Sequence, residues 1–317
     1  MLSSFLLENL ACPTCQAHPL KVSRDSLTCP VCSQVFPIRD SICYLLPDYS
    51  RFAHYFTEYE ADKLTKDRDI ITKKGSSTDE SIGQGYDEKW MIPGSRREVV
   101  ERVTAFEELA LQPDVTCLDL GAGTLRCSLY ALEKGAARVC GIDLNPGMLK
   151  AGRRKAAERG YAERVDIVVA DVRFIPFRDE TFDSLISLEL IEHIPVGATR
   201  IFQEIFRVLK PGGKAVVNTW SVVRQFRRRR ERNRGYFRGD SFYKFYFPKE
   251  FKLLFTDVAF CKKKIYGHYL RDLYGLLYRL HIPHCLEAGM ITERMIRRYL
   301  PSLSILLGSF LMVYLEK

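Results

Sequence analysis

The sequence has no apolar stretch long enough to cross a bilayer as a helix. Its longest, SLSILLGSFLMVYL at 302–315, has fourteen residues, whereas a transmembrane helix needs about twenty. The first residues, MLSSFLLENLACPTC, lack a basic segment and place Glu8 inside the apolar run, which is not the pattern of a secretory signal peptide. We therefore expect a soluble, cytoplasmic protein.

Acidic residues are scarce in the last third of the chain. Residues 1–95 carry ten Lys and Arg against thirteen Asp and Glu, and residues 96–215 carry eighteen of each kind. Residues 216–317 carry twenty Lys and Arg against only eight Asp and Glu, so the formal charge of +9 arises there. An excess of basic residues in one region favours an anionic partner, such as a nucleic acid or a membrane surface.

The cysteines show no pairing pattern outside one short segment. Four of the ten, Cys12, Cys15, Cys29 and Cys32, form two C-x2-C pairs separated by thirteen residues. This spacing can present four thiolates to one Zn(II). A pair of disulfides or a redox C-x2-C site is the alternative, and disulfides are rare in the cytosol. About forty residues cannot build an adequate core, so metal binding would supply most of this segment's folding free energy.

From Val115 onward, short apolar runs alternate with helical patterns. The predicted strands are VTCLDL, ARVCGID, VDIVVA, FDSLISL and GKAVVNTW, and the intervening helices are LRCSLYALEK, PGMLKAGRRKAAER and ATRIFQEIFRVLK. This alternation predicts an α/β fold with a parallel sheet covered on both faces. Ligands of such sheets bind at the carboxyl ends of the strands.

The residues that follow the predicted strands are suited to binding a nucleoside. Gly121 and Gly123, after Asp119, let the backbone approach a ligand closely. Asp143 lies twenty residues after Gly123, at the end of the second strand, where a carboxylate can accept hydrogen bonds from ribose hydroxyls. Asp171 and Val172 follow the third strand.

The run from CLDLGAGT to PGGKAVV resembles the class I S-adenosylmethionine-dependent methyltransferases (type 11-like) over about 105 residues. The resemblance implies a Rossmann-like fold with a mostly parallel seven-stranded sheet and S-adenosylmethionine as cofactor. It implies that Gly121 and Gly123 pack against the methionine part, that Asp143 holds the ribose and that Asp171 and Val172 meet the adenine. Leu188 and Glu189 would border the sulfonium, and Asp119 and Leu144 are further residues implied to bind the cofactor.

A dinucleotide-dependent dehydrogenase is the alternative, because it would also use Gly121, Gly123 and Asp143. It does not account for Asp171 followed by Pro176-Phe177, or for the Lys-Pro-Gly-Gly stretch at 210–213.

Residues 2–48 are similar to the small zinc-ribbon activator proteins that bind RNA and protein methyltransferases. The resemblance rests on LLENLACPTC and LTCPVCSQVFPIRDSICYLLPD, although Ser41-Ile42-Cys43 replaces the Gly-Ile-Pro usual in that family. It implies a folding and docking module that packs on this chain's own methyltransferase domain.

The domain organisation follows from these patterns. We predict a zinc ribbon at 1–49, a linker and helical lead-in at 50–95, and a methyltransferase domain at 96–317 that begins with the helix REVVERVTAFEELAL. Within that domain we predict a basic insertion at 221–240, a helical insertion at 268–300 and a final strand at about 308–316.

Methyl transfer needs alignment of donor and acceptor more than it needs a general base. If the acceptor must lose a proton, Glu189 and His193 are the candidate catalytic residues. A packing or capping role explains His193 more readily, whereas the two roles are evenly balanced for Glu189.

The segment Arg224–Arg238, RQFRRRRERNRGYFR, carries eight arginines with interleaved aromatic residues. It could neutralise phosphates and stack on unpaired bases. Together with a similarity of PGGKAVVNTW and YKFYFPKEFKLLF to wobble-uridine tRNA methyltransferases, it favours an RNA acceptor, although a solvated arginine loop without a partner is equally compatible. The alternatives are a lipid, lipid-linked glycan or small-molecule acceptor at an anionic membrane surface, and a non-catalytic cofactor-binding scaffold.

Overall fold

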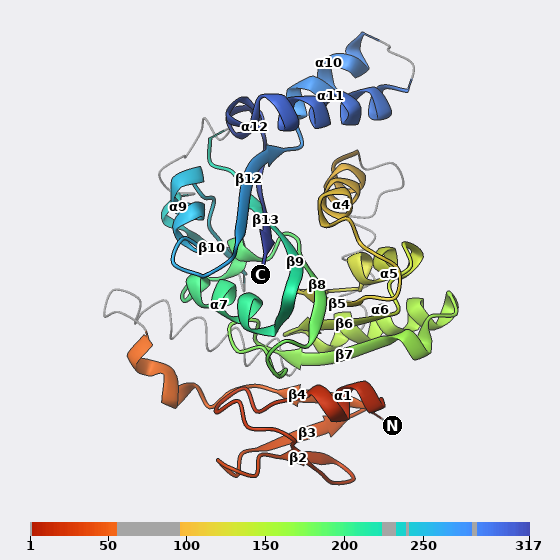
Figure 1. Ribbon diagram of the computed structural model, residues 1–317, viewed down its shortest axis with the longest axis vertical. Coiled ribbons are helices and arrows are strands. Elements are labelled where there is room, and N and C mark those ends of the chain that lie inside the picture. The colour runs from red at the N-terminus through yellow and green to blue at the C-terminus, as the bar shows by residue number, and fades with distance from the viewer. Residues whose placement is uncertain (1, 56–95, 224–232, 239–240, 281–283) are drawn as a thin grey trace.

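One large sheet organises the protein. The computed structural model describes residues 2–55, 96–223, 233–238, 241–280 and 284–317. In this part of the chain eleven strands form a sheet in the order β1-β2-β3-β4-β7-β6-β5-β8-β9-β13-β12 (Figure 1). The strands β10 (Tyr236–Arg238) and β11 (Ser241–Tyr243) pair separately as a hairpin.

Seven of these strands make up the sheet that the sequence predicts. They are β5 (Thr116–Leu120), β6 (Arg138–Asp143), β7 (Val165–Ala170), β8 (Phe182–Ser187), β9 (Leu209–Trp220), β12 (Lys262–His268) and β13 (Phe310–Glu316). Only β13 runs antiparallel to its neighbours β9 and β12. The carboxyl ends of the other six strands therefore meet at one edge, and β13 confirms the predicted final strand.

Helices cover both faces of this sheet, as predicted (Figure 1). On one face lie α4 (Arg96–Leu109), α5 (Arg126–Glu133) and α6 (Pro146–Glu158), and on the other lie α7 (Ala198–Val208) and α9 (Pro248–Leu253). Alternate residues of one strand face the two layers: in β5, Cys117 packs toward α4–α6 and Leu118 toward α7 and α9. Every residue of β7 is buried because both of its faces are covered.

The zinc-ribbon segment adds four strands to the sheet, which the sequence analysis did not foresee. It consists of α1 (Ser4–Asn9), β1 (Lys21–Val22), β2 (Ser26–Thr28), β3 (Val35–Arg39) and β4 (Ile42–Leu45). The strand β4 pairs in parallel with β7, with Cys43 opposite Val168 and Leu45 opposite Ala170. The ribbon therefore packs on its own chain, as predicted, by completing the sheet.

Side chains of the ribbon also enter the core of the larger domain. Leu10 is 2% exposed and forms an isolated bridge with Phe177. The Ala11 amide donates to the Pro176 carbonyl at 3.0 Å, and the ring of Phe5 lies 6.1 Å from that of Phe182. One hydrophobic core consequently spans the ribbon and the face of the sheet that α7 covers.

Two insertions differ from their predicted extents. The helical insertion between β12 and β13 contains α10 (Arg271–Arg279), α11 (Cys285–Tyr299) and α12 (Pro301–Leu307), so it continues seven residues beyond the predicted end at 300. Of the basic insertion, residues 224–232 and 239–240 lie outside the described residues, as do residues 56–95 of the predicted lead-in. The ribbon is followed by a 3-10 helix, η1 (Tyr49–Tyr55). Among the described residues, no helix has the length and apolar character needed to cross a bilayer.

The shared core predicts that the ribbon and the larger domain unfold together. Leu10→Ala should lower the free energy of unfolding of the whole chain by about 2–4 kcal/mol, because it leaves a cavity between the two parts. Thermal or denaturant unfolding, followed by far-UV circular dichroism and tryptophan fluorescence, should still show one transition. Leu7→Ala is the matched control on the same helix, since Leu7 is 37% exposed, and should change stability by less than about 0.5 kcal/mol. Two separate transitions, of which only one shifts, would contradict a shared core.

Candidate active site and metal centre

The loop after β5 places Gly121 and Gly123 at the carboxyl edge of the sheet. Both have left-handed backbones, with φ of 72° and 51°. The amides of Gly121 and Ala122 donate to the carbonyl of Ile142, at 2.9 and 3.0 Å, which holds the loop against the end of β6. A Cβ atom on Gly121 would lie 2.9 Å from the Leu190 side chain, so only glycine fits there.

Asp143 lies at the end of β6, beside this loop. Its Oδ2 accepts from the Gly123 amide at 3.0 Å, and its Oδ1 accepts from the Asn145 amide at 2.8 Å. Asn145 caps α6 by accepting from the Met148 amide. Leu144, between them, is half-buried. The carboxylate is therefore held in place by backbone donors while its remaining lone pairs can accept from ribose hydroxyls.

A small cavity, partly open to solvent, brings together four of the predicted residues. Its lining consists of Glu101, Arg102, Asp119, Gly121, Ala122, Arg126, Cys127, Leu188 and Glu189. Glu101 and Arg102 belong to α4 and were missed by the sequence analysis, although the charged residues of REVVER within an amphipathic helix were a usable signal. The cavity has both charge signs along its wall, as a methionine ammonium and carboxylate require.

Asp119 is nearly fully buried at this cavity. Its Oδ2 accepts from the Ser128 amide at 3.0 Å and from the Ser128 hydroxyl at 2.7 Å. Burial raises the pKa of Asp119 to about 6, and these two hydrogen bonds offset only part of that effect. A nearby ammonium would favour the ionised form.

Asp171, after β7, is held by residues from two parts of the chain. Its carboxylate accepts from the Arg173 guanidinium at 2.7 Å and from the Tyr49 hydroxyl at 2.9 Å. Burial opposes ionisation, but the charge and hydrogen bonds of Arg173 outweigh it and keep the pKa of Asp171 below its usual value. Tyr49 follows the ribbon, and no sequence signal pointed to this contact. The assignment of Asp171 and of the buried Val172 to adenine stays a prediction.

Glu189 has an unusual backbone conformation at the end of β8. Its φ is 55°, a left-handed value that costs a non-glycine residue about 1–2 kcal/mol. Its amide donates to Asn218 Oδ1 at 2.6 Å, and Asn218 Nδ2 lies 3.4 Å from His268 Nε2. Asn218 and His268 are fully buried, and the sequence analysis did not single them out. They fix the direction in which Glu189 enters the site.

His193 packs against the hairpin of β10 and β11. Its Nδ1 lies 2.8 Å from the carbonyl oxygen of Phe242 and therefore carries a proton. Its ring meets the ring of Tyr243 edge-on, with centroids 4.8 Å apart. These contacts favour the packing role, and a catalytic role for His193 stays a prediction.

An aromatic wall, defined as Trp220, Phe245, His268 and Phe310, lies at the same edge of the sheet. Phe310 of β13 is directly opposite both Trp220 of β9 and His268 of β12. Its ring centroid is 4.7 Å from that of Trp220 and 5.2 Å from that of His268, and Trp220 stacks on Phe245 at 5.2 Å. Sequence analysis could not detect this wall, because its members come from separate strands and a loop.

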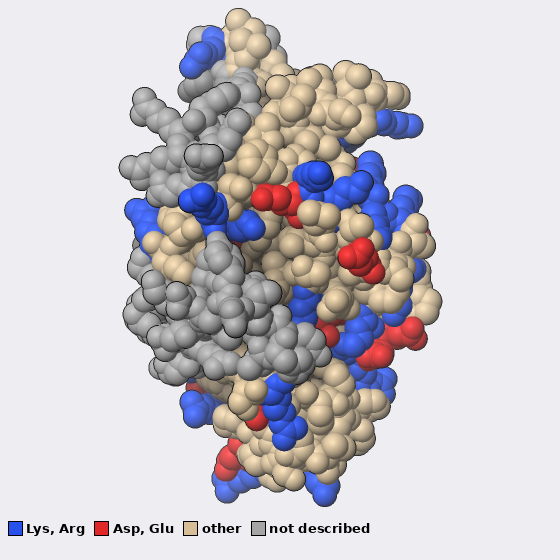
Figure 2. Space-filling view, turned by 90° about the vertical axis from the view of Figure 1, so that its left-hand side faces the viewer, with Lys and Arg blue, Asp and Glu red and all other residues tan. Residues whose placement is uncertain are grey.

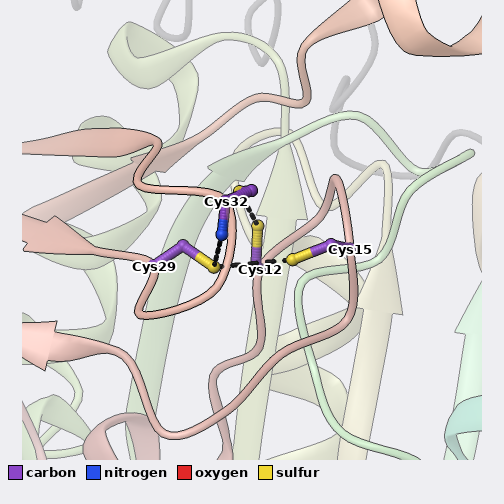
Figure 3. A group of neighbouring side chains, drawn as sticks. All are labelled: Cys12, Cys15, Cys29 and Cys32. Atoms are coloured by element: carbon purple, nitrogen blue, oxygen red, sulfur yellow. Dashed lines mark hydrogen bonds between the residues drawn. The ribbon is translucent and has the colours of Figure 1, made fainter.

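The four cysteines of the ribbon form a cluster that fits zinc (Figure 3). All four sulfur atoms lie within 4.8 Å of one another, with Cys12 and Cys32 at 3.6 Å and Cys15 and Cys29 at 3.5 Å. Four thiolates placed tetrahedrally at about 2.3 Å from Zn(II) would be about 3.8 Å apart. The Cys32 amide also donates to Cys29 Sγ, which helps to orient this thiolate.

Family models match both parts of the chain. The model described as "Methyltransferase domain" matches residues 118–217, and the model described as "Trm112p-like protein" matches residues 3–41. Residues 118–217 thus form a methyltransferase domain, which the sequence resemblance assigns to class I. S-adenosylmethionine is the methyl donor of this class, and the glycine loop and charged cavity fit it. The Trm112p-like domain precedes the methyltransferase domain and contains the cysteine cluster.

Curated relatives are similar to the methyltransferase domain. A sterol 4-C-methyltransferase of Caenorhabditis elegans is 38% identical over 35% of this chain and 33% of its own. A ubiquinone/menaquinone biosynthesis C-methyltransferase of Geotalea daltonii is 28% identical over 52% of this chain and 66% of its own. The matches thus span between one third and about two thirds of these relatives.

Among solved structures, geranyl diphosphate C-methyltransferase from Streptomyces coelicolor superposes with a TM-score of 0.49 and 19% identity. It covers 73% of this chain and 82% of its own.

The cysteine cluster predicts one bound zinc per chain in reduced protein, measurable by plasma emission spectrometry. Removal of zinc with a chelator, or Cys29→Ser, should lower the midpoint of the single unfolding transition, because β4 and α1 belong to the shared core. Cys261→Ser is the control, since Cys261 is an exposed cysteine outside the cluster. Folded, reduced protein that contains no zinc would contradict this prediction.

Asp119→Asn should stabilise the ligand-free protein and weaken cofactor binding. The carboxyl pKa is about 6 in the folded state against an ordinary value of 3.8, so the folded state binds this proton more tightly than the unfolded state. The contribution of Asp119 is therefore favourable below about pH 4 and is lost as the pH rises through about 6. At pH 7 we expect the variant to gain about 1–3 kcal/mol in chemical denaturation. Calorimetry should show at least about tenfold weaker S-adenosylhomocysteine binding. Wild-type affinity, or lower stability at pH 7, would contradict this role.

Proposed function

We propose that this protein transfers the methyl group of S-adenosylmethionine to an apolar acceptor of the isoprenoid, sterol or quinone class. The observation that carries the proposal is the aromatic wall beside Glu189. Trp220 and Asn218 lie two residues apart on β9, and Asn218 holds the Glu189 backbone through a 2.6 Å hydrogen bond. The proposal places the acceptor against the partly exposed ring of Trp220, which the buried rings of the wall support from behind.

In this proposal the cofactor supplies a methyl group activated by the positively charged sulfur. Gly121 and Gly123 admit its methionine part, Asp143 accepts from the ribose, and the backbone at Asp171 and Val172 meets the adenine. Leu188 and Glu189 border the sulfonium. The aromatic wall excludes water and presents ring faces that attract a cation. The wall also positions a planar or branched hydrocarbon for in-line attack.

Glu189 is the proposed proton acceptor where the attacking atom must lose a proton. It lines the cavity, is half-buried, and is held by Asn218 in a strained conformation. Strain of this kind persists where the surroundings enforce it, as at active sites. His193 is proposed to position the β10–β11 hairpin.

The relatives support the apolar acceptor class. The two curated relatives named above act on a sterol and in ubiquinone/menaquinone biosynthesis. Because the alignments cover only part of this chain and of each relative, the acceptor class is proposed from the aromatic wall and the relatives together.

RNA is the second candidate acceptor, and it is favoured by the Trm112p-like domain and by the arginines of residues 224–238. In the described part of that segment, the ring of Tyr236 stacks on that of Tyr243 at 5.8 Å. Residues 224–232, with most of the arginines, lie outside the described residues. The aromatic wall does not require this segment, and we therefore favour the apolar acceptor.

The test is transfer of labelled methyl groups from S-adenosylmethionine to total lipid extract and, in parallel, to total small RNA. We expect the label in organic-phase material that is resistant to RNase. Gly121→Val is the inactive control, because its side chain would clash with Leu190 in the cofactor loop. Trp220→Ala should lower kcat/KM for the lipid fraction at least about tenfold while leaving S-adenosylhomocysteine affinity unchanged.

If the label is confined to RNase-sensitive material, the acceptor is RNA and the proposed apolar acceptor is wrong. An unchanged kcat/KM in Trp220→Ala would contradict the placement of the acceptor against the aromatic wall.

A further inference from the structure

The exposed apolar side chains of the protein gather on the helical insertion. Among the described residues, thirteen large hydrophobic side chains are exposed, and eight of them lie between 276 and 306. They are Leu276, Leu280, Ile291, Met295, Tyr299, Leu300, Leu303 and Leu306, and we call them the apolar face of α10–α12. Single exposed hydrophobic residues are ordinary, but a contiguous group is a mark of an interaction site.

The helix α11 buries one ion pair and exposes three large apolar side chains on the opposite side. Glu293 and Arg297 are 1% and 3% exposed and form an ion pair at 3.4 Å. Ile291, Met295 and Tyr299, which follow one another at intervals of four residues on the other side, are 58%, 52% and 62% exposed. This orientation is the reverse of that expected for a helix on a water-soluble surface.

Specific contacts hold α11 in this orientation. The Glu293 carboxylate accepts from the Tyr269 and Leu270 amides at 2.9 and 3.1 Å, which ties the helix to the end of β12. Arg294 pairs with Glu107 of α4. Rotation of α11 to hide its apolar side would break the buried ion pair and leave its charges without partners, which is strongly unfavourable.

The helix α12 shows the same arrangement. Ser304 on its inner side is buried, and its hydroxyl accepts from the Gly267 amide at 3.1 Å. A Cβ atom on Gly267 would clash with the Ser304 carbonyl oxygen, so helix and strand are in close contact. Leu300, Leu303 and Leu306 are left on the outer side.

The surroundings of the apolar face point to a lipid surface. Exposed arginines, Arg279 and Arg298, lie among these residues, and the Arg298 guanidinium lies 5.5 Å from the centre of the Tyr299 ring. In Figure 2 the upper end of the molecule is mostly tan, with blue side chains toward its margins. Apolar and aromatic side chains flanked by arginines match the boundary between acyl chains and anionic headgroups.

We propose that the apolar face of α10–α12 docks on an anionic lipid bilayer. The insertion leaves the sheet after His268 and returns at Phe310, two members of the aromatic wall. Docking would therefore bring the acceptor side of the site next to the membrane that holds an apolar acceptor. Only this consequence for the acceptor rests on the proposed function, because lipid binding itself is measurable without turnover.

The test is sedimentation with phosphatidylcholine vesicles that contain or lack phosphatidylglycerol. We expect the wild-type protein to bind both, and the anionic vesicles more tightly at low salt. The double variant Ile291→Glu/Met295→Glu should lower the partition coefficient at least about tenfold, because it removes two apolar side chains that the bilayer would bury. Val22→Glu/Leu253→Glu is the matched control, since its residues are 56% and 59% exposed elsewhere, and should bind like the wild type.

Three outcomes would overturn the docking proposal: no vesicle binding by the wild type, equal binding by the Ile291→Glu/Met295→Glu variant, or equal loss in the control. A concentration-dependent dimer that this variant abolishes, without vesicle binding, would replace the bilayer by a second copy. S-adenosylhomocysteine binding shows that each variant is folded.

The docking proposal and the proposed acceptor class can be refuted independently of each other. If detergent-dispersed lipid is methylated but vesicles are not bound, the docking surface is refuted and the function stands. If vesicles are bound but the label enters only RNA, the acceptor class is refuted and the docking surface stands.

Discussion

The parallel pairing of β4 with β7 is the contact on which the arrangement of the protein depends. It converts a metal-bound ribbon, too small for a core of its own, into the outer strands of an eleven-stranded sheet. Because alternate residues of β4 face the two helical layers, Cys43 and Leu45 join one core and Ile42 and Tyr44 the other. The cysteine cluster therefore supports the methyltransferase domain as well as the ribbon.

This junction also reaches the cofactor edge. The chain that leaves β4 supplies Tyr49, whose hydroxyl donates to the carboxylate of Asp171, and Phe52, whose ring lies 4.3 Å from that of Phe174. Asp171 follows β7, the strand that β4 pairs with, so strand pairing and cofactor loop are neighbours. The ribbon thus has a direct structural connection to a residue predicted to meet the adenine.

At the other end of the sheet, buried polar contacts determine which surface is left outside. The ion pair of Glu293 and Arg297 and the close approach of Gly267 to Ser304 use the inner sides of α11 and α12. The leucines, the isoleucine and the methionine on the outer sides of these helices remain exposed to solvent. These buried contacts favour a single orientation of the two helices, which is why the apolar side is presented outward.

Much of the fold was predictable because its signals are local. Short buried runs that alternate with amphipathic helices indicate a covered parallel sheet, and glycine or aspartate after a strand indicates the ligand edge, as Gly121 and Asp143 show. The two C-x2-C pairs similarly predicted the cluster of four sulfur atoms. In each case the residues that act together are close in sequence, or are separated by one repeating unit.

The sequence by itself therefore determined the class of fold, the cluster of four cysteines and the edge of the sheet at which the glycine loop and Asp143 lie. Only the tertiary structure decided that the ribbon extends the sheet, that Tyr49 meets Asp171, and that Phe310 joins Trp220 and His268 in one wall. These contacts unite residues 42 to 125 positions apart. Pairing at such distances depends on strand order and on which side of a helix is buried, and neither periodicity nor spacing encodes that choice.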